Sequence, residues 1–68
     1  MNEEVFNLQL RQFLKKFGIT AQREIEHHVR NALENGAIRG NERLDVTARL
    51  TLAGLPPEIV VEGRIALE

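Results

Sequence analysis

The segment LDVTARLTL, residues 44–52, alternates apolar and polar side chains at every position. A second segment, IVVEGRIAL at residues 59–67, repeats this alternation at most of its positions. Successive side chains of a β-strand point to opposite faces, so each segment predicts a strand with one apolar face. The intervening residues 53–58, AGLPPE, are rich in turn formers. We therefore expect an antiparallel β-hairpin with strands at about 43–53 and 58–67, and with both prolines outside the hydrogen-bonded ladder.

The register of the hairpin is predicted by keeping apolar residues opposite apolar residues on one face. The pairs in this register are Leu52 with Ile59, Arg49 with Glu62, and Ala48 with Gly63. The last pair sets two small residues side by side, and we expect a phenylalanine to fill the resulting notch. The opposite face is expected to expose six residues to solvent, namely Asp45, Thr47, Arg49, Thr51, Glu62 and Arg64.

Apolar residues before the hairpin recur at spacings of three and four, which is typical of amphipathic helices. Asn2 is a suitable N-cap, and Gly18 is a suitable residue just past a helix end, so we expect a first helix at about 3–17. Thr20 is a second N-cap candidate, and we expect a second helix at about 20–35. The predicted fold is therefore α+β, with the order α-α-β-β and with two helices packed on one face of the hairpin.

The 68 residues are expected to form a single domain, residues 1–68. The chain has no cysteine, which excludes disulfides and thiolate ligands. Its first residues lack the basic and apolar regions of a signal peptide. No apolar run approaches the roughly 20 residues of a membrane span. We therefore expect a cytoplasmic location and no membrane partner.

The charge balance bears on nucleic-acid binding. Nine Lys and Arg residues face ten Asp and Glu residues, whereas proteins that bind phosphate backbones usually carry a basic excess. The alternative function that stays open is a helix-turn-helix with a wing, with its turn at residues 18–20. Its contacts would be Arg23, His27, Arg30, Arg49 and Arg64. Acidic residues on or beside the same helical surface, Glu24, Glu26 and Glu34, disfavour this alternative.

The chain offers little for catalysis. It contains no Ser, Cys or Tyr, and the only side-chain hydroxyls belong to Thr20, Thr47 and Thr51. The pair Glu24 and His27 has the spacing of some helical metal sites, but both residues lie away from the apolar stripe. We interpret them, with the adjacent His28, as solvated side chains. We expect no enzyme activity, no catalytic residues, no metal and no cofactor.

Two features indicate association. A two-stranded sheet has two unpaired edges, which proteins normally cover, twist or charge. Val5 and Leu8 lie outside the main apolar stripe of the first helix, where they would suit a protein interface. We therefore predict a non-catalytic protein-interaction or self-associating module. Its partner would be itself, as a homodimer, or another protein.

The chain resembles a small bacterial family of uncharacterised short proteins, a domain of unknown function. The resemblance lies in MNEEVFN at residues 1–7, FLKK at 13–16, GIT at 18–20 and QREIE at 22–26, followed by the glycine-containing alternating C-terminus. These are capping, core and surface residues. The resemblance implies a stand-alone bacterial protein of this length, and it assigns no activity and no site residues.

Overall fold

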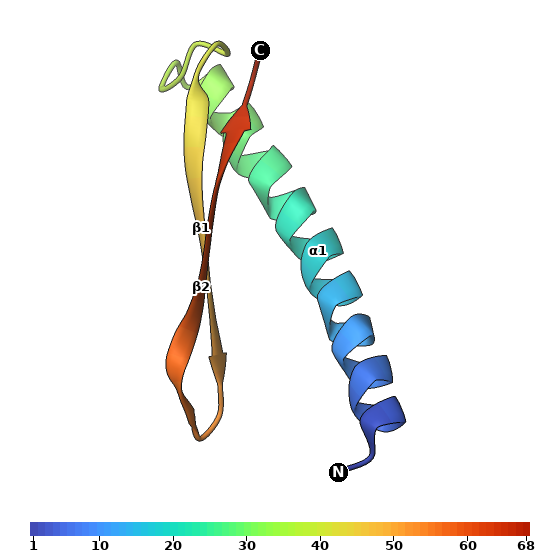
Figure 1. The fold of residues 1–68 in the computed structure, drawn as a ribbon. Coiled ribbons are helices and arrows are strands. Elements are labelled where there is room, and N and C mark those ends of the chain that lie inside the picture. The colour runs from blue at the N-terminus through green and yellow to red at the C-terminus, as the bar shows by residue number, and fades with distance from the viewer. The chain divides into compact units, whose positions relative to one another are not determined.

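The computed structural model describes residues 1–68 as one helix followed by a hairpin (Figure 1). Helix α1 spans Glu3–Glu34, strand β1 spans Arg43–Leu52, and strand β2 spans Leu55–Ala66. The α+β class and the antiparallel hairpin are confirmed, whereas the prediction of two helices is wrong. The chain divides into two compact units, residues 1–35 and 36–68, and each is described by itself.

Helix α1 passes without interruption through the predicted break at Gly18 and Thr20. Gly18 is not among the glycines with positive φ, so it does not end the helix, and Thr20 is not an N-cap. A break would leave four carbonyls and four amide groups without helical partners. A glycine inside a helix costs only about 1 kcal/mol relative to alanine. The apolar spacing from Phe17 through Ala21 to Ile25 also continues across the predicted break, so one 32-residue helix is favoured.

Both ends of α1 are capped. The Asn2 side-chain oxygen accepts a hydrogen bond from the Val5 amide at 3.1 Å, which confirms Asn2 as the N-cap. Glu3 and Glu4 lie in the first turn, where the helix dipole favours negative charge. At the other end, Asn35 donates its amide hydrogen to the carbonyl of Asn31 at 2.9 Å. The next residue, a glycine, turns the chain out of the helix with a φ of 75°.

The register of the hairpin differs from the predicted one by two residues. Ala48 lies opposite Val61, and Gly63 lies opposite Val46, so the predicted notch of two small residues does not form. The expectation of a phenylalanine filling that notch is therefore wrong. Three further pairs also correct the prediction: Leu50 with Ile59, Arg49 with Val60, and Thr47 with Glu62.

The turn and an irregularity beside it together set the register. Leu52 pairs with Leu55 across a two-residue turn, where the prediction has a six-residue connection. Gly54 has a φ of 75°, which favours glycine at this position of the turn. Pro56 and Pro57 lie within β2, but at the irregularity between the Leu50 and Leu52 pairs, where neither has a partner in the ladder. Prolines are tolerated at such irregularities because no ladder hydrogen bond is lost there.

The two faces of the hairpin differ in exposure along β1, as the alternation predicts, whereas every residue of β2 is exposed. The six residues expected on the polar face are all exposed. Along β1, the alternating residues Leu44, Val46, Ala48 and Leu50 are half-buried. Neither unit of the chain contains a buried side chain. No helix of the chain has the length and apolarity that crossing a bilayer would require.

Candidate interaction surfaces

The main apolar stripe of α1 is rich in aromatic residues. Phe13 and Phe17 stack with ring centroids 6.3 Å apart and an interplanar angle of 21°. They lie one helical turn apart, so both rings project from the same side of the helix. Phe6, Leu10 and Leu14 continue this surface, and every one of the five side chains is exposed. The stripe is therefore an open apolar surface along the N-terminal half of the helix.

A second apolar stripe lies on the other side of α1. At about 100° per residue, Val5, Leu8 and Ile19 fall within about 60° of one another and roughly opposite the phenylalanines. Their exposed fractions are 49%, 59% and 51%. We call these three residues the second stripe. Val5 and Leu8 were predicted as interface residues, whereas Ile19 was missed because it was assigned to a turn. Its spacing of eleven residues from Leu8, about three helical turns, is the signal that identifies it.

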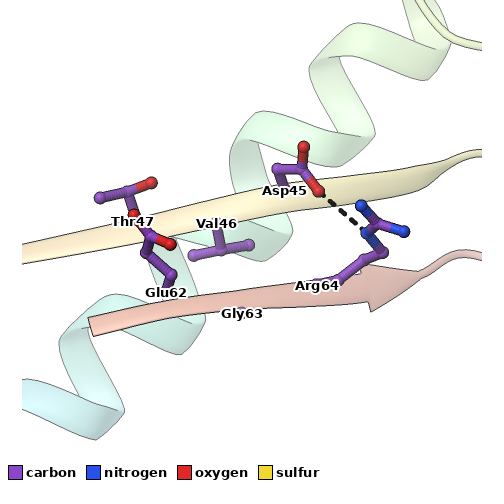
Figure 2. A pocket seen from close by; sticks show the side chains of 6 residues that line it. All are labelled: Asp45, Val46, Thr47, Glu62, Gly63 and Arg64. Atoms are coloured by element: carbon purple, nitrogen blue, oxygen red, sulfur yellow. Dashed lines mark hydrogen bonds and ion pairs between the residues drawn. The ribbon is translucent and has the colours of Figure 1, made fainter.

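An open depression of the hairpin lies along its two strands (Figure 2). Six residues line it: Asp45, Val46, Thr47, Glu62, Gly63 and Arg64. Arg64 donates from Nε to the Asp45 carboxylate at 2.9 Å, so the two charges neutralise each other. Thr47 and Glu62 lie opposite each other two residues further along the strands, and Val46 and Gly63 form the pair between them. The depression is open and holds neither a histidine nor a cysteine, so its chemistry is that of a paired polar surface.

The candidate nucleic-acid contacts belong to both units, three to the helix and two to the hairpin. Arg23, His27 and Arg30 fall within about 60° of one another around α1, since each residue turns about 100°. Arg49 is paired with Glu58 at 2.9 Å, and Arg64 is paired as described above. The helix-turn-helix, which the sequence left open as an alternative, is not present, because α1 is continuous where its turn would lie.

The histidine cluster is solvent-exposed. His28 Nε2 lies 3.9 Å from the Glu24 carboxylate, and both side chains are largely exposed. Glu26 accepts a hydrogen bond from Gln22 at 3.0 Å. The chain has no group of three or more His, Asp or Glu side chains that could hold a metal ion together. The geometry of this cluster is that of ordinary neighbours on a helix surface.

A carboxylate organises the loop that precedes β1. Glu42 accepts hydrogen bonds from the backbone amides of Arg39 at 2.8 Å and Gly40 at 2.9 Å. These two bonds stabilise the ionised form and hold the pKa of Glu42 below its ordinary value. Gly40 has a φ of 105°, a conformation that favours glycine. The loop is thus held by one side chain that sequence reasoning had not singled out.

The helix and the hairpin define a small α+β protein. The chain belongs to a family of unknown function (DUF6494), whose model matches residues 1–68. The predicted resemblance to a domain of unknown function is thereby confirmed. Neither the search of curated proteins nor the search of solved structures gave a match to the chain.

Proposed function

We propose that this protein is a non-catalytic protein-interaction module whose helix binds a second protein through the second stripe. The observation that supports the proposal is that α1 carries apolar side chains on two opposite sides of its N-terminal half. One packing partner can cover only one side of a helix. The second stripe therefore remains for another protein, whatever covers the phenylalanines.

The composition of the second stripe suits a protein partner. Burying a large aliphatic side chain contributes roughly 1.5–3 kcal/mol, so three of them supply a useful part of a binding free energy. Lys15 and Lys16 flank the stripe on the helix, and they provide a basic rim. An apolar centre with a charged rim is the usual anatomy of an interface between proteins.

The experiment places a photo-crosslinking amino acid at Leu8 in cells that express the chain. The matched control carries it at Asn7, which is also exposed but points about 100° or more away from all three residues of the second stripe. We expect a discrete protein adduct from position 8 and none from position 7. Equal labelling at both positions, or no adduct at position 8, would contradict the proposal.

A double substitution gives the complementary test. Val5→Asp with Leu8→Asp is expected to abolish the adduct, measured with the crosslinker at position 19, and to leave the far-ultraviolet circular dichroism of the helix unchanged. Lys15→Ala with Lys16→Ala removes only the rim and should weaken binding with a dependence on salt. If the aspartate substitutions instead unfold the protein, the second stripe belongs to its own core and the proposal is wrong.

A further inference from the structure

We infer that the hairpin unit pairs with a second copy of the chain along the free edge of β1, forming a four-stranded sheet. This inference rests on the proposed function, an association module, and assigns its hairpin a surface and a partner. The sheet has two strands, so the outer edge of β1 has no strand beside it within the chain. An unpaired edge is a template for another strand. The order of the shared sheet would be β2-β1 followed by β1-β2 of the second copy.

The hydrogen-bonding pattern identifies which residues face that edge. Leu67 donates its amide hydrogen to the carbonyl of Glu42 at 3.0 Å, and this pair continues the ladder of β1 and β2. Hydrogen-bonded pairs recur at every second residue of an antiparallel ladder. The even-numbered residues of β1 therefore bond to β2, whereas the odd-numbered ones direct their peptide groups outward. These are Arg43, Asp45, Thr47, Arg49 and Thr51.

Charge selects one register for the pairing of β1 with itself. The apolar faces of both copies stay on the same side only when odd residues pair with odd residues. With Thr47 on the two-fold axis, Asp45 of each copy lies opposite Arg49 of the other. Moving the axis to Val46 would set Arg43 against Arg49. Moving it to Ala48 would set Asp45 against Thr51, so no ion pair would form between the copies. Axes at Asp45 or Arg49 would set identical charges against each other, and like charges directly opposite are destabilising.

The register centred on Thr47 extends ion pairs that each copy already contains. Asp45 is bound by Arg64 at 2.9 Å, and Arg49 is bound by Glu58 at 2.9 Å. The polar face of the shared sheet would then carry two rows of charged side chains, and positive and negative charges would alternate along each row. Each row runs from Arg64 and Asp45 of one copy to Arg49 and Glu58 of the other. The two Thr47 side chains meet between these rows, where threonine pairs interact favourably.

The same register joins the apolar faces. Leu44 lies opposite Leu50 of the second copy, and Val46 lies opposite Ala48, at positions where the side chains of antiparallel strands approach most closely. An isolated two-stranded hairpin is marginally stable in water, whereas three or more strands with an apolar face are stable. Pairing along β1 thus doubles the width of the apolar face and leaves no charge within it.

The outer edge of β2 is less suited to pairing. The residues of β2 whose peptide groups point outward are the even-numbered ones, which include Pro56. Proline has no amide hydrogen to donate, and prolines are a common protection of sheet edges. β2 also contains Gly63, which weakens a strand, whereas β1 contains neither proline nor glycine.

The test exchanges charges between the copies while keeping each pair within the chain. One variant combines Asp45→Arg with Arg64→Asp, and the other combines Arg49→Glu with Glu58→Arg. Each keeps its internal ion pair in reversed polarity and leaves the net charge unchanged. Alone, each variant sets like charges opposite each other in the shared sheet. We expect sedimentation equilibrium to give dimer dissociation constants at least about tenfold weaker for each variant than for the unsubstituted chain. An equimolar mixture of the two should restore dimer formation.

A cysteine reports the register directly, because the chain has none of its own. Thr47→Cys should form a disulfide-linked dimer under mild oxidation, since the two positions face each other across the axis. Thr51→Cys is the matched control. Its two copies would lie about 26 Å apart at about 3.3 Å per residue, beyond the reach of a disulfide.

The possible failures separate the two proposals. If the unsubstituted chain is monomeric at millimolar concentration, the shared sheet is wrong, while the adduct at Leu8 still tests the helix interface. If the chain dimerises but is insensitive to the charge exchange and is not linked at position 47, association uses another surface, such as the edge of β2. That result overturns this inference and leaves an association module in place.

Discussion

The sharpest test of the fold is the substitution Gly18→Ala. Gly18 lies inside α1, and a Cβ atom added to it meets no atom within 4 Å. Alanine is about 1 kcal/mol more favourable than glycine in a helix interior. We therefore expect Gly18→Ala to raise the free energy of unfolding by about 1 kcal/mol. If Gly18 instead ended a first helix with positive φ, alanine would cost roughly 1–2 kcal/mol there. The sign of the change in the free energy of unfolding therefore distinguishes a continuous helix from a helix that ends at Gly18.

Gly36 provides the matched control for this substitution. An added Cβ at Gly36 also meets no atom within 4 Å, but the residue has a φ of 75°. Gly36→Ala should therefore lower the free energy of unfolding by roughly 1–2 kcal/mol through backbone strain alone. Both variants are compared by denaturant unfolding at one protein concentration, since the proposed association would make stability depend on concentration. If Gly18→Ala destabilises the protein as much as Gly36→Ala does, the continuous helix is refuted.

Three further predictions concern the helix cap, the loop and the hairpin. Asn2→Ala should destabilise the first turn of α1 by about 1 kcal/mol, seen as faster amide exchange at Val5, whereas Asn2→Asp should not. Because the folded-state pKa of Glu42 is lowered, its stabilisation of the loop is present above the unfolded pKa and is lost as the pH falls through the folded value. The amide resonances of Arg39 and Gly40 should report this transition, and Glu42→Gln should abolish it. Finally, Thr47→Cys with Glu62→Cys should form an intramolecular disulfide in monomeric protein, whereas Thr47→Cys with Arg64→Cys, which tests the register predicted from sequence, should not.

Local end signals misled the sequence analysis of the helix. Glycine after an amphipathic run, followed by threonine, has the composition of one helix ending and another beginning. The apolar residues on both sides of Gly18 nevertheless follow one uninterrupted stripe, through Phe17, Ala21 and Ile25. A stripe that keeps its phase across a glycine indicates that the helix continues. The same error hid Ile19, since its place on the second stripe exists only in a continuous helix.

The hairpin was predictable in its faces but not in its register. Alternation fixes which residues lie on each face, and a shift of two residues preserves that division. Both registers place apolar residues opposite one another, so the alternation cannot separate them. Two local features decide instead. A two-residue connection at Gly54 pairs Leu52 with Leu55, and the irregularity between the Leu50 and Leu52 pairs then shifts the ladder so that Leu50 pairs with Ile59. The double proline at 56 and 57 was taken as part of a long loop, whereas it lies at an irregularity inside β2.

The candidate surfaces were predictable to the same extent: the sequence predicts which side of an element is apolar but not what packs against it. A periodic pattern predicts that one side of an element is apolar, but it does not encode what covers that side. In β1 the charged residues say more about a packing partner than the apolar residues do. Asp45 and Arg49 are four residues apart on one edge of β1, with opposite charges placed symmetrically about Thr47. A strand with this arrangement is complementary in charge to an antiparallel copy of itself, and this complementarity, which the apolar residues alone do not provide, is the basis of the pairing that we propose.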